Sequence, residues 1–306
     1  MYYIGFDIGG TKCAVSLGKW DGNEIQLIAR KETETLAYPY ETLGALAPFV
    51  KEWLKNYPII RAGISCGGPL DLQRGIIGAV PNLSKQWDGF EIVFYVKDNF
   101  GLNANLKNDA DASAVAEWKF GAGRGAKNVI FMTFGTGLGA GLILDGKLYS
   151  GTNGNAGEIG HVRLAKNGPV GCNKEGSAEG FCSGSGIKKL ALIRAQEKNL
   201  PIQQDITTKI IFEKAKAGDK FYLSVIKESA EKFGQVISIL IDLFNPEIIV
   251  AGGVFMRNYD FFMEILTPII EKEALAPSNK ACKILPAQIG ENIGDYAALS
   301  VAVLED

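Results

Sequence analysis

Short apolar runs separated by glycine-rich turns open the chain. Residues 2–18 combine the run YYIGFD, the turn IGGTK and the run CAVSLG, and apolar runs bounded by glycine are typical of strands. Residues 128–148 repeat the plan with NVIFMTF, GTGLGAG and LILDGKL. Two hairpins of the same kind predict two related halves.

Longer segments place apolar residues at helical spacing. Leu43, Leu46, Val50 and Trp53 predict a helix over residues 40–57, which Pro58 ends. Residues 59–71 read as a strand that runs into a glycine-proline turn. The other expected elements are helices over residues 109–120, 186–198, 207–217, 221–244 and 292–304, and a buried strand over residues 247–254. This alternation predicts an α/β protein with a domain boundary near residue 110.

Composition excludes several classes of protein. The 306 residues are 47% hydrophobic and 22% charged, with a net charge of −2, which are globular values without the basic excess of a nucleic-acid partner. No apolar run approaches the ~20 residues of a membrane span, and the N-terminus lacks the pattern of a signal peptide. The five cysteines have no paired spacing, so we expect no disulfide framework. We expect a soluble, cytoplasmic protein without nucleic-acid or membrane partners.

The first glycine turn has the chemistry of a phosphate site. Gly9 and Gly10 let backbone N–H groups approach an anion, while Thr11 adds a hydroxyl and Lys12 a positive charge. Asp7 offers oxygen ligands that suit Mg²⁺, directly or through its waters. The alternative is a tight turn in which Asp7 and Thr11 satisfy only the local backbone.

Two further glycine clusters follow expected strands. They comprise Gly135, Thr136, Gly137 and Gly139 in one turn, and Gly252 and Gly253 in the other. The first cluster is similar to a dinucleotide-binding fingerprint, but that fingerprint must open a helix, and a strand is expected here. The second would let a nucleotide base or ribose approach the backbone. Taken alone, it is more typical of a simple strand-to-helix turn.

Together, the three glycine turns resemble the sugar kinase, heat-shock and actin superfamily, and more narrowly the ROK family (repressors, open reading frames and kinases). The resemblance is carried by DIGGTK at 7–12, GGPLD at 67–71, PNLSKQWDG at 81–89, NDADASAVAEW at 108–118, TFGTGLGAG at 133–141, GEIGH at 157–161 and AGGV at 251–254. It implies a two-domain actin-like (ribonuclease H-like) ATPase fold. Residues 1–110, joined by the C-terminal helix 292–306, would form the smaller domain, residues 111–291 the larger, and ATP and sugar would bind in the cleft between them.

Phosphoryl transfer to an alcohol needs a carboxylate that accepts the hydroxyl proton. Asp109 stands at the start of an expected helix, where its carboxylate would serve as this base or merely as a helix cap. The resemblance implies that Asp109 is the catalytic base, with ATP and Mg²⁺ as cofactors. It also implies a set of sugar contacts, which are Gly68, Asn82, Asn108, Asp109, Glu158, His161 and Glu179.

One segment departs from the family pattern. Many members carry CxCGxxGCxE after GEIGH, and its three cysteines and the histidine bind structural zinc. Val170 and Ser177 occupy two of the cysteine positions here, which leaves Cys172 and His161, whereas structural zinc takes four ligands. We therefore expect no zinc, and a loop held by packing of Phe181 and hydrogen bonds from Ser177.

The resemblance implies an ATP:hexose 6-phosphotransferase. Glucose is the first expected substrate, N-acetylmannosamine or N-acetylglucosamine the second, and fructose and allose remain open. A non-catalytic sugar-sensing ROK protein is the alternative from another class. A repressor would place a helix-turn-helix module before the kinase-like part, and only three residues precede Ile4. Family resemblance also leads us to expect a homodimer.

Overall fold

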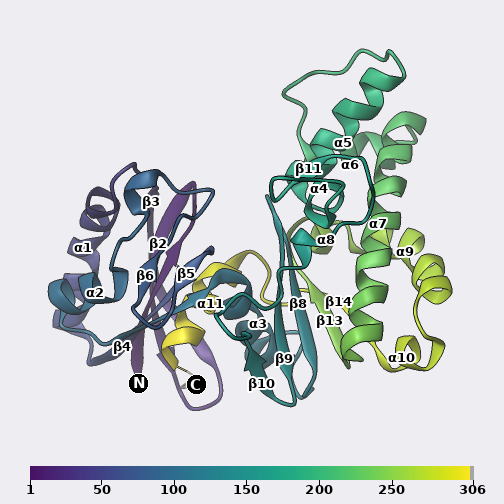
Figure 1. Ribbon diagram of the computed structural model, residues 1–306. Coiled ribbons are helices and arrows are strands. Elements are labelled where there is room, and N and C mark those ends of the chain that lie inside the picture. Colours follow the sequence, from purple (N-terminus) through teal and green to yellow (C-terminus); the bar gives the residue numbers. More distant parts are fainter. Residues whose placement is uncertain (304–306) are drawn as a thin grey trace. The chain divides into compact units, whose positions relative to one another are not determined.

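The chain divides into two compact units in this computed structural model, which describes residues 1–303 (Figure 1). Unit 1 comprises Met1–Gly125, Gly141–Ala156 and the C-terminal segment from Gln288 onward, and unit 2 comprises Ala126–Ala140 and Gly157–Ala287. This division differs from a boundary near residue 110, because helix α3 (Asp109–Phe120) packs on α11 (Ile293–Val303) and so belongs to unit 1.

A five-stranded sheet forms the centre of unit 1. Its order is β3-β2-β1-β4-β7, in which β1 is antiparallel to β2 and parallel to β4. The strands are β1 (Tyr2–Ile8), β2 (Lys12–Trp20), β3 (Ile25–Glu34), β4 (Ile59–Cys66) and β7 (Ala104–Asn108). The first expected hairpin is therefore confirmed. Because β1, β4 and β7 run parallel, the residues at their carboxyl ends meet at one edge of the sheet.

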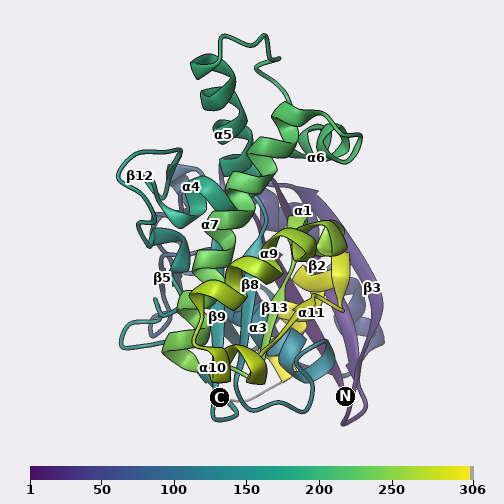
Figure 2. The ribbon, with the colours of Figure 1, turned by 90° about the vertical axis from the view of Figure 1, so that its right-hand side faces the viewer.

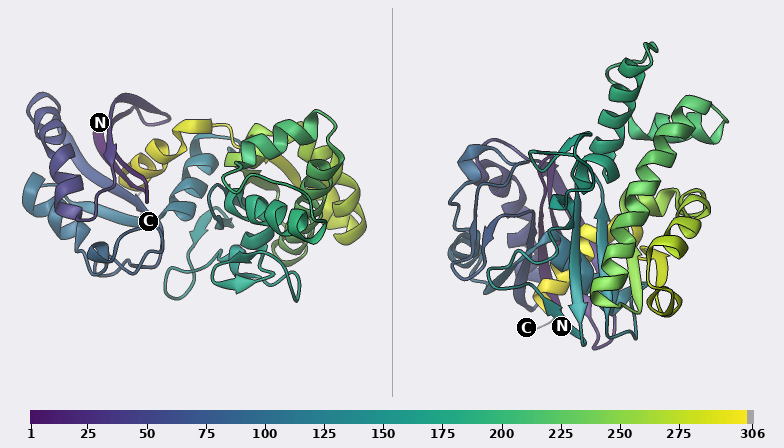
Figure 3. Two further views of the ribbon diagram at one scale, coloured as in Figure 1. Left: turned by 90° about the horizontal axis from the view of Figure 1, so that it is seen from above. Right: turned by 45° about the vertical axis from the view of Figure 1, so that its right-hand side comes forward.

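Helices cover both faces of this sheet. Helices α1 (Pro39–Asn56) and α2 (Ile92–Phe100) lie on one face, and α11 lies on the other, beside α3 (Figures 1 and 3). Helix α11 packs on β1 and β4 with Ala298 and Leu299 fully buried. The shorter elements of unit 1 are β5 (Leu70–Asp71), β6 (Ile76–Ile77), η1 (Lys85–Trp87), β10 (Lys147–Tyr149) and η3 (Gly290–Asn292).

A second five-stranded sheet has the order β10-β9-β8-β13-β14, and the unit boundary passes through β9. Its longer strands are β8 (Val129–Phe134), β9 (Leu138–Leu144), β13 (Ile248–Ala251) and β14 (Lys283–Pro286). Unit 2 also contains η2 (Ile159–His161), β11 (Val170–Gly171), β12 (Lys174–Glu175), α4 (Ala178–Cys182), α5 (Gly184–Glu197), α6 (Thr208–Lys216), α7 (Lys220–Phe244), α8 (Gly253–Arg257), α9 (Tyr259–Glu273) and α10 (Ala276–Ala281).

Aromatic rings form the core of unit 2 where α7 and α9 lie against β8 (Figures 1 and 2). The ring of Phe134, at the end of β8, lies 5.0 Å from that of Phe233 on α7 and 5.8 Å from that of Phe262 on α9. Tilted and edge-on ring pairs at such distances add to the energy of apolar burial. This core anchors the end of β8, from which the second glycine turn leaves.

The pattern of apolar residues did not indicate every element. The pattern did not indicate strand β3, because this edge strand leaves most of its residues partly or fully exposed. Helix α9 escaped it because Pro268 stands inside the helix, and proline is normally read as a helix breaker. Among residues 1–303, no helix is long and apolar enough to cross a membrane.

Candidate active site

The turn between β1 and β2 brings the predicted phosphate residues of unit 1 together. The Gly9 N–H donates to the carbonyl of Lys12 at 3.1 Å, and the Thr35 hydroxyl donates to the carbonyl of Gly9 at 2.6 Å. Gly10 is exposed and packs directly against Asn82. The turn therefore has a fixed shape, and it places a predicted sugar contact beside a predicted phosphate contact.

Asp7 ends β1 among other carboxylates. Burial, with Asp295 and Asp109 nearby, raises the pKa of Asp7 from its ordinary value of 3.8 to about 6. A carboxylate with other negative charges nearby favours a bound cation, and Mg²⁺ generally takes one or two carboxylates with phosphate and water. The donors here fit that ion. Among residues 1–303, no three His, Cys, Asp or Glu side chains form a complete metal cluster.

Asp109 begins α3, directly after β7. Its Oδ1 accepts the N–H of Ala110 at 2.9 Å, and a side chain at Gly67 would place its Cβ 3.9 Å from Oδ2. The carboxylate reaches solvent, yet protein crowds its surroundings, and this desolvation raises its pKa above the ordinary value. The Asp109 carboxylate is therefore accessible to a substrate, while the protein packed around it raises its pKa.

Asn108, and not Asp109, caps α3. Its Oδ1 accepts the N–H groups of Ala110 and Asp111, at 2.9 and 3.5 Å, which is the usual N-cap role of asparagine. A Cβ at Gly68 would lie 3.2 Å from Nδ2 of Asn108. The cap thus orients the amide nitrogen toward Gly68, where it is available as a donor. The structure brings Asp7, Gly10, Gly68, Asn82, Asn108 and Asp109 to one edge of the unit 1 sheet.

The second glycine turn, residues 135–139, is held by backbone groups and hydroxyls of unit 2. The Gly184 N–H donates to the carbonyl of Gly135 at 2.7 Å, and the Ser185 hydroxyl donates to that of Thr136 at 2.7 Å. Gly139 donates its N–H to the Thr133 hydroxyl at 2.9 Å. No ionisable side chain belongs to this turn, so it offers an anion only N–H groups and the Thr136 hydroxyl.

The third glycine pair lies beside this turn. Gly253 has φ +58 in the left-handed region, and any side chain there would collide with the carbonyl of Phe134. Gly252 donates its N–H to Met132 at 3.0 Å. The predicted nucleotide residues of unit 2 therefore converge, with Gly252 and Gly253 next to the end of β8.

Glu179 links the glycine turn to a second loop of unit 2. Its Oε2 accepts the N–H of Leu138 at 3.2 Å, and its Oε1 accepts the N–H of Cys172 at 2.8 Å. Each oxygen keeps a lone pair for a further donor. Glu179 therefore joins the two loops, a role that the sequence did not indicate.

Glu158 and His161 lie together where η2 begins and ends. The Glu158 Oε2 is 3.8 Å from the His161 Nε2, and both side chains are about half exposed. The Lys174 ammonium donates to the carbonyl of His161 at 2.7 Å. Both predicted sugar residues therefore reach solvent from a short loop whose backbone is fixed.

The β11–β12 hairpin occupies the place of the family's zinc loop. The Ser177 hydroxyl, fully buried, donates to the carbonyl of Gly171 at 2.8 Å, and the Phe181 ring packs against Gly168. Burial and the nearby Glu179 raise the pKa of Cys172 to about 12, which disfavours the thiolate that zinc binds. These side chains do not fit a structural zinc site. A zinc-free loop stays a prediction.

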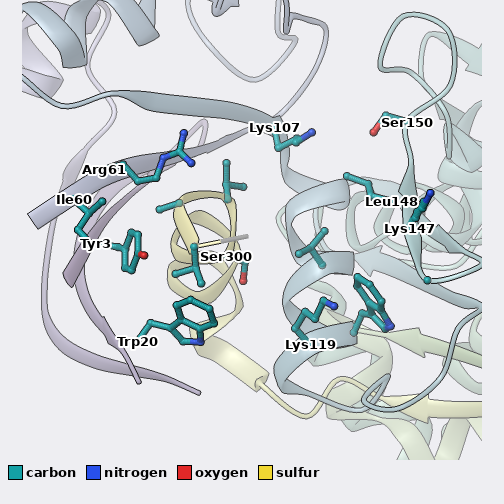
Figure 4. A pocket seen from close by; sticks show the side chains of 16 residues that line it. Tyr3, Trp20, Ile60, Arg61, Lys107, Lys119, Lys147, Leu148, Ser150 and Ser300 are labelled. Atoms are coloured by element: carbon teal, nitrogen blue, oxygen red, sulfur yellow. The ribbon is translucent and has the colours of Figure 1, made fainter. Parts of the chain in front are cut away.

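A cavity of about 980 Å³ lies elsewhere in unit 1 (Figure 4). It is bordered by α3, α11, β10 and the beginning of β4, and Figure 4 labels Trp20, Arg61, Lys107, Lys119 and Lys147 among its lining side chains. Its described lining contains none of the predicted site residues and no carboxylate. Phosphoryl transfer needs a base, so we place the candidate site at Asp109 instead.

Three charged residues near the first turn were missed by the sequence reasoning. Arg30 pairs with Asp295 at 3.0 Å and with Glu32 at 2.6 Å. Two lie on the overlooked strand β3, and the third lies in the closing helix. One signal was available, because Asp295 is the sole charged residue of the apolar segment IGDYAALSVAV.

Known proteins share both the sequence pattern and the fold of this chain. The family model described as "ROK family" matches residues 3–303. A glucokinase of Streptomyces coelicolor is 31% identical over 98% of this chain and 96% of its own length. A ROK family glucokinase from Streptomyces griseus, solved with glucose and AMPPNP, has a TM-score of 0.75 at 29% identity and covers 97% of this chain and 98% of its own.

A transcription regulator is also similar. The xylose repressor of Caldicellulosiruptor bescii is 31% identical over 76% of this chain and 61% of its own length. Kinases and a repressor thus share this sequence pattern. With a family match over residues 3–303 and a mixed α/β architecture like that of a solved ROK sugar kinase, the chain belongs to the ROK family and has its actin-like ATPase fold.

Proposed function

We propose that this protein is an ATP-dependent hexokinase that transfers the γ-phosphoryl group of ATP to the C6 hydroxyl of a hexose, with glucose as the first substrate. The observation that carries the proposal is the pair of carboxylates at one sheet edge. Asp109 begins α3 after β7, and its charge acts on Asp7 at the end of β1. A base and a cation ligand in such proximity suit phosphoryl transfer to an alcohol.

Asp109 would accept the hydroxyl proton. Its Oδ1 is held by the N–H of Ala110, which leaves Oδ2, on the side of Gly67, to receive the proton. Desolvation raises the pKa of Asp109, which makes the carboxylate a stronger base. The positive end of α3 lies beneath it and stabilises the ionised form.

The glycine turns would bind the nucleotide. Residues 9–12 offer N–H groups, a hydroxyl and the Lys12 ammonium, while residues 135–139 offer N–H groups and one hydroxyl, that of Thr136. When bound at Asp7, directly or through its waters, Mg²⁺ would supply positive charge against the phosphates. Asp7 would orient the ion.

The sugar would take its hydrogen bonds from Asn108, Glu158, His161 and Glu179. The Streptomyces coelicolor and Streptomyces griseus relatives are glucokinases, and the latter was solved with glucose, which supports glucose as the first choice. N-acetylmannosamine or N-acetylglucosamine is the runner-up. A site of hydrogen-bonding groups strongly rejects a sugar that lacks a matching hydroxyl, whereas an added substituent is judged mainly by space.

The similarity to a xylose repressor supports a second candidate, a sugar-binding protein without turnover. A coupled ADP-release assay with Mg-ATP separates the two. Its panel would contain glucose, mannose, fructose, allose, N-acetylglucosamine and N-acetylmannosamine. One sugar well above the rest supports a kinase and names its substrate. ATP binding without release on any sugar would overturn the kinase proposal and favour the sensor.

A further inference from the structure

Four charged side chains form a continuous chain of hydrogen bonds across β2, β3 and α11. The Lys12 ammonium donates to Oε1 of Glu32 at 2.6 Å, and Nη1 of Arg30 donates to Oε2 of the same carboxylate at 2.6 Å. The Nε of Arg30 then donates to both oxygens of Asp295, at 3.1 and 3.0 Å. This series of hydrogen bonds begins at Lys12, beside the first glycine turn, and ends at Asp295 on α11.

Its inner end is a buried charge. Asp295 is 4% exposed and also accepts a hydrogen bond from the Ser16 hydroxyl. Every other residue of α11 is uncharged. The Arg30 side chain is 40% exposed, so only the carboxylate is buried, and an ion pair at a buried carboxylate is often no more stabilising than apolar residues of the same volume. Stability alone therefore does not explain a carboxylate at this position.

The Asp295 end of this pair also lies close to Asp7. A side chain at Gly294, the residue before Asp295, would collide with Oδ2 of Asp7. Burial raises the pKa of Asp7 most, the charge of Asp295 raises it further, and the charge of Arg30 lowers it. The Arg30–Asp295 ion pair is thus connected to both charged residues that flank the turn. Asp7 lies beside the first turn of α11, which contains Asp295, and Lys12 is linked to Arg30 through Glu32.

We propose that Arg30, paired with Asp295, is a positioning residue for the triphosphate side of the site. It holds Glu32, which holds the Lys12 ammonium, and it fixes the first turn of α11 beside the Asp7 carboxylate. This inference rests on the proposed function, because the ligand of the turn is then the triphosphate of ATP. A purely structural ion pair is the competing explanation.

Kinetics of Arg30→Met, with Asp295→Asn and the double variant, would separate the explanations. Arg30→Met is expected to raise KM for Mg-ATP about tenfold or more, and to change the sugar KM less than about twofold. The variant also leaves Asp295 buried without its cation, so its Tm should fall.

The double variant is the decisive one. Removing both charges should restore most of the Tm, because no uncompensated charge is then buried. KM for Mg-ATP should stay high, because Glu32 still has no bond from Arg30 and so does not hold Lys12 in place. If the pair were only structural, Tm and KM would recover together, and that result would overturn the proposal. In Arg30→Lys the single ammonium can bind either Glu32 or Asp295 but not both as arginine does, so KM for Mg-ATP should be intermediate.

Unit 2 offers a matched control. Arg194 joins Glu197 at 2.7 Å and Glu228 at 2.5 Å, between α5 and α7, so it too bridges two acids. Arg194→Met should lower the Tm and leave KM for Mg-ATP unchanged. If this control raised that KM as much as Arg30→Met does, the effect would be general loosening and the proposal would fail.

Calorimetric binding of Mg-AMPPNP separates failure of the inference from failure of the proposed function. Should no sugar support ADP release, the kinase proposal fails, yet weakening of AMPPNP binding about tenfold by Arg30→Met, and not by Arg194→Met, still supports the positioning role. Unchanged binding in Arg30→Met, or no binding by the wild-type protein, overturns it.

Discussion

The two glycine turns follow the same strand-turn-strand plan, yet they differ in charge. The turn of unit 1 is flanked by Asp7 on β1 and Lys12 on β2, and a chain of ion pairs runs from Lys12 to Asp295. The turn of unit 2 contains no ionisable residue, and the carboxylate that supports it, Glu179, comes from α4. The two turns therefore share a backbone arrangement but not the charged side chains around it.

This contrast assigns different work to the two turns. Burial, together with the charges of Asp295 and Asp109, raises the pKa of Asp7, which is a suitable environment for a cation. The turn at residues 135–139 has its shape set by backbone hydrogen bonds. Substitutions around the first turn should therefore alter the charges that act on the phosphates and the reacting hydroxyl. Substitutions around residues 135–139 should alter the shape of the turn.

The largest effect should come from Asp109→Asn on the charged side. Without the base, kcat should fall about 10³-fold, within the range usual for general-base groups. Sugar affinity, measured by calorimetry, should remain within about twofold. Asp98→Asn, an exposed aspartate on α2, is the control and should behave as wild type. Full activity in Asp109→Asn would show that the base has been assigned wrongly.

Gly137→Ala should break the uncharged turn by shape alone. The new Cβ would lie 2.6 Å from Oε2 of Glu179, whereas a Cβ at Gly135 would meet nothing within 4 Å. Displacing Glu179 should raise KM for both Mg-ATP and sugar, about tenfold each, because this carboxylate joins the two loops. Thermal unfolding should show a lower Tm for Gly137→Ala than for Gly135→Ala. Equal melting temperatures would contradict the contact.

Asp7→Asn should stabilise the metal-free protein while impairing turnover. The folded-state pKa of about 6 exceeds the ordinary 3.8, so the folded state binds this proton more tightly than the unfolded chain. Ionised Asp7 therefore destabilises the fold above pH 6, and this penalty disappears as pH falls from about 6 to about 4. With EDTA, the variant should melt higher than wild type at pH 8 and equally at pH 4. A constant difference at every pH would refute the assignment.

Ser177→Ala should give the smallest of these effects. It leaves the Gly171 carbonyl and the Gly180 N–H without their hydroxyl partner, at a cost of about 2 kcal/mol, and should raise the sugar KM slightly. Ser224→Ala, at an exposed position of α7, is the control. EDTA should not alter the Tm of the wild-type protein, and stoichiometric zinc in the purified protein would contradict the zinc-free loop.

Local patterns were enough to predict much of the fold. Glycine between short apolar runs predicted the hairpin of β1 and β2, and the expected helix over residues 109–120 matches α3. These succeed because backbone conformation at glycine and the period of apolar residues are decided by near neighbours in the chain. The glycine turns were predicted for the same reason, whereas the role of Asp109 and the ROK family rested on the resemblance of the motifs to that family.

The surroundings of those residues depended on tertiary structure. Arg30 and Asp295 are 265 residues apart in sequence, and Glu179 lies 41 residues beyond Leu138, so no local pattern links them. The sequence by itself determined the glycine turns, the α/β alternation and which residues carry charge. Only the packing of α11 beneath the first turn and of α4 beside the second decided which charges meet, because electrostatic interactions depend on distance in space and on burial.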